Sequence, residues 1–283
     1  METTNSPERI TKEDIRLKTP RVGGTAIVIE RHGDYIKDKD SERRGSLKDS
    51  VPEELREQGK MALSGVLEQL TPNERESLDV LIVASDTRYI DKGQRAIETG
   101  NALMAGIGDA FTAKGLEADK HILNKKEEVQ IKGEGGPRPT PTIREPDIFE
   151  NGFFFRLQEE FPDNPWKAYE EGEMADLRKE LGAESTEGVG DRLARFLDVV
   201  YRYSRIYHRK NPGRRLIVWI TTHYDTISPY VKNHVAQRHD PKWYLPVDNE
   251  GGIVVNIDPN GEAKTEIAGV EYPVSIKTTS INS

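Results

Sequence analysis

The chain has 283 residues, of which 35% are hydrophobic and 32% are charged, and this length favours one large α/β core with insertions over two small cores. Its formal net charge of −8 at pH 7 gives no general attraction to nucleic acid or to anionic membranes, so we expect neither as a partner. The absence of cysteine excludes disulfides, thiolate chemistry and cysteine-ligated zinc.

Residues 1–24 are charged and contain no hydrophobic segment, so we expect a flexible N-terminal tail and not a signal peptide. No run of about 18 apolar residues, the length needed to cross a membrane, occurs anywhere in the chain. Together with the lack of cysteine, these features favour a cytoplasmic location.

Three short apolar runs are predicted to be buried strands because of their length and their β-branched residues. They are "TAIVIE" (25–30), "DVLIVA" (79–84) and "LIVWIT" (216–221). Apolar residues recur at helical spacing between them, in 53–70, 94–105 and 190–207. Strands alternating with helices predict an α/β fold with a mostly parallel, doubly wound sheet flanked by helices. Ligands bind beyond the carboxyl ends of such strands, where the polar residues that follow these three runs would meet.

The remaining segments are predicted to be accessories of this core. Residues 34–50 are dominated by charge and are expected to form a solvated loop. Residues from about 112 to 142 contain "GEGGPRPTPT" and are expected to form an insertion without regular structure. The acidic segment 153–181 is expected to form a helical cap anchored by "FFFRL" and "NPWKAY". From residue 252 onward, a Pro-Asn-Gly turn predicts a hairpin. We therefore expect 25–283 to form a single domain with insertions.

The first predicted strand ends in Arg31, His32 and Gly33. A neutral imidazole nitrogen can attack a phosphoryl group, a neighbouring guanidinium can hold phosphate oxygens with two parallel hydrogen bonds, and glycine permits close approach of the backbone. The tripeptide alone is also compatible with an ordinary turn that carries solvated charges.

Further motifs along 25–257 resemble those of the histidine phosphatase superfamily, the phosphoglycerate mutase-like family. In chain order they are "RHG", "LREQGKMA", "ASDTRYIDKGQRAIETG", "IREPDIFENG", "GAESTEGVGDRLARFL" and "WITTHY". Each of these motifs is degenerate, but the order in which they occur matches that of the family. The resemblance implies a phosphoglycerate mutase-like fold and a phosphoryl-transfer enzyme.

The resemblance also implies roles for individual residues. His32 would be the phosphorylated nucleophile, Arg31, Arg95 and His223 would surround the transferred phosphoryl group, and Glu145 would protonate the leaving oxygen. Two arginines and a protonated histidine supply the positive charge that phosphoryl transfer needs, so we expect no metal and no cofactor. To act as an acid near neutral pH, Glu145 needs a raised pKa. The expected substrate is a small or medium organic phosphate ester.

Some of these assignments have structural alternatives. His223 could be a hydrogen-bonded histidine at a strand end, and Glu145 a surface carboxylate. Ser185 is expected to cap a helix. Two pairs of residues could instead suggest a metal site, namely His223 with Asp225 and His239 with Asp240. No regular ligand spacing connects these pairs. The histidines without a motif are expected to be exposed: His121, His208, His234 and His239.

Two departures from the family pattern bear on function. The second family arginine usually follows the strand-end serine after three residues, a place that Tyr89 occupies here, so either Arg95 or Arg88 would bind phosphate. We favour Arg95, because it keeps the Arg-Ala-x-Glu-Thr context at a helix start. The stretch after Gly33 lacks the Ser and Asn of the mutases, which favours a phosphomonoester hydrolase. A phosphoglycerate or phosphosugar mutase, or a non-catalytic phosphate-binding or scaffold protein, is the alternative, and the sequence makes no prediction of oligomeric state.

Overall fold

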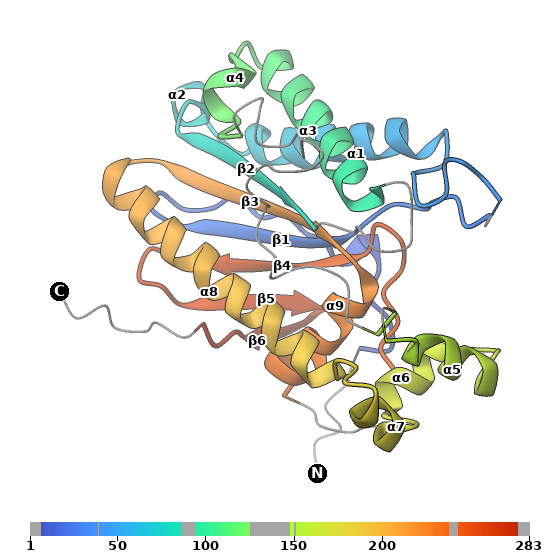
Figure 1. The fold of residues 1–283 in the computed structure, drawn as a ribbon. Helices are drawn as coiled ribbons and strands as arrows, with labels where there is room; N and C mark the ends of the chain where they lie inside the picture. The colour runs from blue at the N-terminus through green and yellow to red at the C-terminus, as the bar shows by residue number, and fades with distance from the viewer. Residues whose placement is uncertain are drawn as a thin grey trace.

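A six-stranded sheet forms the centre of the molecule (Figure 1). The computed structural model describes residues 7–38, 40–85, 94–124, 148–149, 151–237 and 243–276. In these residues the strands are β1 (Thr25–Arg31), β2 (Leu78–Ala84), β3 (Arg215–Thr222), β4 (Gly252–Ile257), β5 (Ala263–Ile267) and β6 (Val270–Pro273). Their order across the sheet is β2-β3-β1-β4-β5-β6. The three apolar runs of the sequence are therefore the three strands at one side of the sheet.

The sheet is mixed and not mostly parallel. β1 and β2 each pair in parallel with β3, whereas β4 pairs antiparallel with β1, β5 with β4, and β6 with β5. Short turns join β4, β5 and β6, and a short connection permits only antiparallel pairing. The α/β fold with flanking helices agrees with the sequence prediction, but a mostly parallel sheet is not confirmed.

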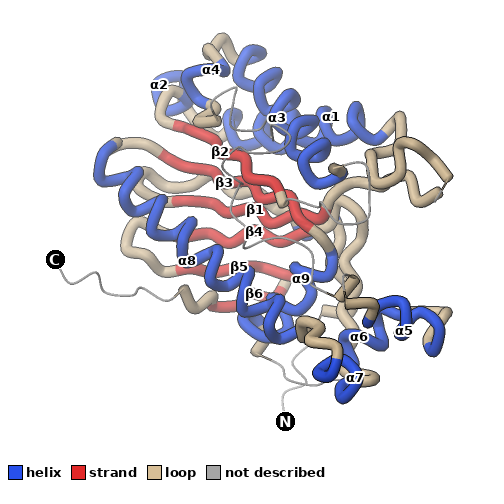
Figure 2. The backbone as a smooth tube through the Cα atoms, viewed as in Figure 1, coloured by secondary structure: helices blue, strands red, loops and turns tan. Residues whose placement is uncertain are grey.

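Helices cover both faces of the sheet (Figure 2). On β1, Ala26 and Val28 pack with α1 (Val51–Glu68) and α3 (Arg95–Ala113). The residues between and after them, Ile27 and Ile29, pack with α8 (Thr186–Lys210) and α9 (Tyr224–Tyr230) on the other face. Successive side chains of a strand point to opposite faces, so a strand buried on both faces is expected to carry a continuous apolar run such as residues 26–29.

Helix α1 packs very closely against α3. A Cβ atom at Gly106 would lie 1.8 Å from the carbonyl oxygen of Arg56, and one at Gly59 would lie 2.7 Å from that of Leu103. Only glycine fits at these two crossing points, which fix the middle of α3 relative to α1. The first turn of α3 is tied to β3, because the hydroxyl of Thr221 donates a hydrogen bond of 2.7 Å to the carbonyl oxygen of Ala96.

The shorter helices lie at the ends of the sheet. They are a 3₁₀ turn (Lys12–Asp14), α2 (Pro72–Arg75), α4 (Ala118–His121), α5 (Phe153–Glu160), α6 (Pro165–Glu171), α7 (Ala175–Glu180) and a π-helical turn (Val231–Val235). Helices α5 to α7 form the helical cap expected over 153–181 and have their own apolar cluster. Among the described residues, no helix is long and apolar enough to cross a membrane.

Two expectations about peripheral residues differ from the structure. Within the expected flexible tail, Ile10 is fully buried and forms a bridge with Val247, so residues near it are packed against the core. His121, expected to be exposed, is 2% exposed, stacks on Phe111 and contacts the carbonyl oxygen of Leu78 through Nδ1. No local sequence pattern predicts the burial of these two side chains. That 25–283 form one domain stays a prediction.

Candidate active site

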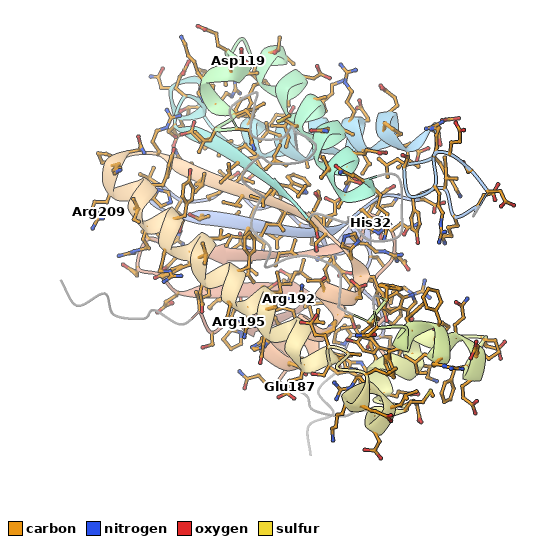
Figure 3. The ribbon with its side chains drawn as sticks, viewed as in Figure 1. His32, Asp119, Glu187, Arg192, Arg195 and Arg209 are labelled. Carbon is orange, nitrogen blue, oxygen red and sulfur yellow. The ribbon has the colours of Figure 1, made fainter. Side chains whose placement is uncertain are left out.

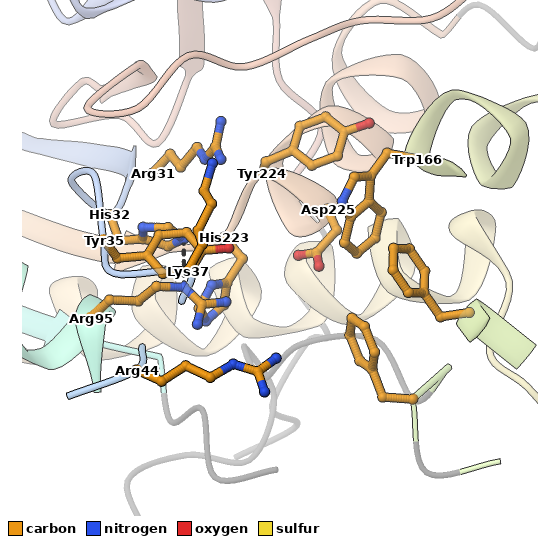
Figure 4. A pocket seen from close by; sticks show the side chains of 12 residues that line it. Arg31, His32, Tyr35, Lys37, Arg44, Arg95, Trp166, His223, Tyr224 and Asp225 are labelled. Atoms are coloured by element: carbon orange, nitrogen blue, oxygen red, sulfur yellow. Dashed lines mark hydrogen bonds between the residues drawn. The ribbon is translucent and has the colours of Figure 1, made fainter. Parts of the chain in front are cut away.

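A pocket with a volume of about 260 Å³ opens beyond the carboxyl ends of β1 and β3. Figure 3 places His32 at this end of the sheet, and Figure 4 shows the side chains around the pocket. Arg31 on β1 lies opposite Thr222 on the parallel strand β3, so the residues that follow the two strands are neighbours. The pocket is lined by four residues that the sequence motifs single out: Arg31, His32, Arg95 and His223.

His32 follows β1 directly and is only 2% exposed. Its Nδ1–H donates a hydrogen bond to the carbonyl oxygen of Gly33 at 2.8 Å, and its Nε2 accepts one from Nε–H of Arg95 at 2.9 Å. Burial, and then the positive charges of Arg95 and Arg31, hold the pKa of His32 well below its usual range. The ring is therefore neutral, with the lone pair on Nε2.

Gly33 connects this histidine to the helices. A Cβ atom there would lie 2.5 Å from Cγ1 of Val51, so the close approach that glycine permits is to α1. The N–H of Gly33 donates to Oγ1 of Thr99 at 3.0 Å, and the N–H of Leu47 donates to the carboxylate of Glu98 at 2.7 Å. Glu98 and Thr99, the last two residues of the "RAIET" motif, thus tie α3 to the loop after His32. The sequence analysis assigned them no role.

Two of the arginines that line the pocket, Arg31 and Arg95, are buried or nearly so. Arg95 is the first residue of α3 and is 6% exposed, and its guanidinium carbon lies 4.3 Å from the centre of the Tyr35 ring. Arg31 donates to the carbonyl oxygen of Val247, and burial lowers its pKa. The Nε–H of Arg31 is buried without a hydrogen-bond partner among the described residues. Because a buried donor without a partner is costly, an anionic oxygen in the pocket would be stabilised there.

His223 lies between β3 and α9 and is 2% exposed. The centre of its ring is 5.1 Å from that of His32, with the two planes at 62°. Burial, followed by the charge of Arg95, holds the pKa of His223 well below its usual range. His223 is therefore neutral, which differs from the protonated form expected from sequence.

Several predicted residues lie outside the described part of the chain. They are Glu145, Arg88, His239 and Asp240. Asp225, considered above with His223 as a metal pair, lines the pocket. Within the described ranges, no group of three or more histidine and carboxylate side chains is arranged to hold a metal ion. Ser185 caps α8 as expected, since its Oγ accepts a hydrogen bond from the N–H of Gly188 at 3.1 Å.

The pocket also has side chains that sequence reasoning missed. Tyr35, Lys37 and Arg44 come from the charged loop after β1, which was expected to be solvated only. Three aromatic residues come from the cap or the chain just before it: Phe149, Phe154 and Trp166. The "FFFRL" and "NPWKAY" stretches marked two of these aromatic residues, but only as apolar anchors. Nothing local indicates that they line the same pocket as Arg31, His32, Arg95 and His223.

Comparison with known proteins gives matches to solved structures only. No family model and no curated protein match the chain. A phosphoglycerate mutase from Bacillus anthracis is 15% identical, with 88% of this chain and 94% of that chain covered and a TM-score of 0.45. A mycobacterial glucosyl-3-phosphoglycerate phosphatase is 14% identical over 86% and 98%, with a TM-score of 0.45. A protein described as mycobacterial hydrolase 1 is 13% identical over 87% and 99%, with a TM-score of 0.47.

These matched structures include phosphoglycerate mutase-like proteins, the family that the sequence motifs resemble. With identities of 13% to 15% and TM-scores below 0.5, the similarities assign neither a substrate nor a reaction to this chain. The chemistry must therefore be argued from the pocket itself.

Proposed function

We propose that this chain is a histidine phosphatase, a phosphomonoester hydrolase that transfers the phosphoryl group of a small or medium organic phosphate first to His32 and then to water. The observation that carries the proposal is the state of His32. Its Nδ1–H is bound to Gly33, its lone pair is on Nε2, and Arg95 lies directly beside that nitrogen. A neutral, oriented imidazole next to a buried guanidinium suits attack on a phosphoryl group.

Each step balances with groups of this chain. In the first step Nε2 of His32 forms a bond to phosphorus, the ester P–O bond breaks, and the leaving oxygen takes a proton from Glu145, the residue that the family resemblance implies as acid. In the second step water attacks phosphorus, the N–P bond breaks, and Glu145 recovers a proton from the water. Neutral His32 and inorganic phosphate result.

Positive charge around the transferred group comes from protein side chains. Arg31 and Arg95 can each donate more than one hydrogen bond to phosphoryl oxygens, and a neutral His223 can donate one. Because these groups stabilise the charge that develops in the transition state, the proposed reaction requires no metal ion. Addition of EDTA is expected to leave the rate unchanged.

Hydrolysis is favoured over a mutase reaction by the composition of the loop after Gly33, which lacks the Ser and Asn that follow this motif in the mutases. Four of its charged side chains pair with one another: Lys48 lies against Asp34, and Arg43 pairs with Asp49 at 2.7 Å. Tyr35, Lys37 and Arg44 of the same loop line the pocket, so the fate of the phosphoryl group decides between the two reactions.

Trapping of the covalent intermediate tests the proposal. Rapid quenching of the chain with a phosphate ester that it turns over should give a base-stable, acid-labile phosphoryl group on His32. His32→Ala should abolish both the adduct and the release of phosphate. Turnover that survives this substitution would disprove the mechanism. Interconversion of 2- and 3-phosphoglycerate with little free phosphate would point to the mutase, and binding of phosphate without any turnover to the non-catalytic alternative.

A further inference from the structure

The pocket has two chemically different halves. Arg31, His32, Arg95 and His223 make a cationic half at the ends of β1 and β3, together with the start of α3. Phe149, Phe154 and Trp166 make an apolar half, called the aromatic wall below. In the close view, Trp166 lies on the opposite side of the pocket from Arg95 and Arg44 (Figure 4). A phosphate ester seated on the cationic half would have the aromatic wall in front of its leaving group.

The three rings of the aromatic wall contact one another. Phe149 and Phe154 have ring centres 4.8 Å apart, and Phe154 and Trp166 have ring centres 4.6 Å apart. The interior of the cap is filled by other side chains, namely Phe153, Leu157 and Tyr169, which are at most 3% exposed. Phe149 and Trp166 are only partly buried. Phe154 is 9% exposed and belongs to the apolar cluster of the cap, against which Phe149 and Trp166 pack, and all three residues also line the pocket.

Tyr224 fixes the aromatic wall relative to the cationic half. Its ring lies 5.7 Å from the guanidinium carbon of Arg31 and 5.6 Å from the Trp166 ring, at 82° to it. The hydroxyl of Tyr224 donates to Glu170 on α6, which also accepts a hydrogen bond from Lys232 at 3.2 Å. A buried hydrogen-bonded network thus links the cap to the core, so the two halves of the pocket hold a defined separation.

From this arrangement we infer that the chain acts on phosphomonoesters whose leaving group carries a flat, uncharged aromatic ring, which stacks on the aromatic wall. This inference rests on the proposed phosphatase function and adds the substrate class. Aromatic rings prefer edge-to-face or offset contacts, and the tilted rings of Phe154 and Trp166 offer both. Asp225 lies between His223 and Trp166 (Figure 4), and its carboxylate would disfavour a second anionic group at this end.

A pair of phosphonates tests the inference without any turnover. Benzylphosphonate and cyclohexylmethylphosphonate have the same charge and the same carbon skeleton, and they differ only in the aromaticity of the ring. Calorimetry with the full chain should give a dissociation constant about threefold to tenfold lower for benzylphosphonate, the range expected for an aromatic pair. In Trp166→Leu this ratio should fall to about one. Phe149→Leu, at a partly exposed position, is the second variant in case the first does not fold.

The matched control is Phe155→Leu. Phe155 is on the same helix as Phe154 but is 51% exposed and does not line the pocket, so this variant should keep the wild-type ratio. Equal affinity of the wild-type chain for the two phosphonates, no binding of either, or loss of the ratio in Phe155→Leu alone would overturn the inference. A different outcome separates the two proposals. If the ratio of the two dissociation constants depends on the aromatic wall but the chain hydrolyses neither benzyl phosphate nor any other ester, the proposed hydrolase is refuted and the inferred class of ligand is supported.

Discussion

The Nε–H group of Arg95 donates a hydrogen bond of 2.9 Å to Nε2 of His32. This is the nitrogen that holds the lone pair, because Nδ1–H is bound to the carbonyl oxygen of Gly33. Burial is the main cause of the lowered pKa of His32, and the Arg95 guanidinium lowers it further and also covers the atom proposed to attack phosphorus. For the reaction to start, Arg95 must turn from His32 to the phosphoryl oxygens, and an arriving dianion supplies the attraction for that movement.

Replacement of Arg95 should therefore have a large effect on turnover. We expect Arg95→Ala to lower kcat by about a hundredfold or more, or roughly 3 kcal/mol of transition-state stabilisation. Arg95→Lys restores the charge without the fork-shaped pair of donors and should remain severely impaired. Arg88→Ala, at the competing sequence candidate, should keep most of its turnover. Steady-state kinetics of the three variants decide between the arginines, and a large loss in Arg88→Ala with a mild one in Arg95→Ala would reverse the assignment.

The protonation of His32 should depend on the same guanidinium. The pKa of His32 is lowered by burial and by the charges of Arg95 and Arg31, so the ring should stay neutral below pH 6.5, where a free histidine becomes protonated. Arg95→Ala removes one positive charge, and the pKa of His32 should rise. NMR titration of the ring measures this directly, even in an inactive variant. Arg56→Ala, at an exposed arginine paired with Asp109, is the control and should leave the titration unchanged; a fall of the pKa in Arg95→Ala would contradict the electrostatic role.

Buried Glu30 should make the stability of the fold depend on pH. It accepts hydrogen bonds from Trp219 at 2.7 Å and Gln58 at 3.3 Å, and burial raises its pKa to about 8, from about 4.5 in the unfolded chain. Between these two values the folded state keeps a proton that the unfolded chain releases. The contribution of Glu30 to the free energy of unfolding should therefore be at its maximum below pH 4.5. It should fall as the pH rises toward 8, by at most about 5 kcal/mol.

Urea denaturation at several pH values measures this dependence, and Glu30→Gln should flatten it. Glu159→Gln, a matched change at a side chain that is 68% exposed, should keep the wild-type slope. If the free energy of unfolding of the wild-type chain rises over this pH range while that of Glu30→Gln is unchanged, Glu30 is ionised in the folded state.

A second buried carboxylate, that of Asp79, should contribute to the stability of the fold and not to activity. Asp79 lies at the beginning of β2, away from the pocket, and accepts hydrogen bonds from Tyr207 and from Arg214 at 2.7 Å. Asp79→Ala leaves these donors without their acceptor and should cost about 3–5 kcal/mol of unfolding free energy. Asp109→Ala removes the exposed pair with Arg56 and should cost less than about 1 kcal/mol. Urea denaturation measures the free energy of unfolding of both variants. Similar losses in Asp79→Ala and Asp109→Ala would mean that burial of the Asp79 cluster does not strengthen its contribution to stability.

The meeting of the two arginines and two histidines of the pocket follows from features that the sequence alone contains. Continuous apolar runs predict β1 and β3, and parallel neighbours place the residues after them, His32 and His223, at one edge. The helical pattern that starts near Arg95 brings its side chain to the same edge. These inferences succeed because they depend on short-range periodicity and on a general rule of sheet geometry, although the catalytic roles of the residues stay predictions.

The direction of the later strands, the location of His121 and the aromatic wall depend on tertiary structure. β4 pairs antiparallel with β1, and its own residues do not encode this direction. Trp166 and Arg31 are far apart in sequence, and both contact the ring of Tyr224. The sequence by itself determined which residues meet at the carboxyl ends of β1 and β3, because strand ends and helix starts are local features. Only the packing of the cap on the core decided which side chains line the other half of the pocket, because contacts between distant segments depend on the whole fold.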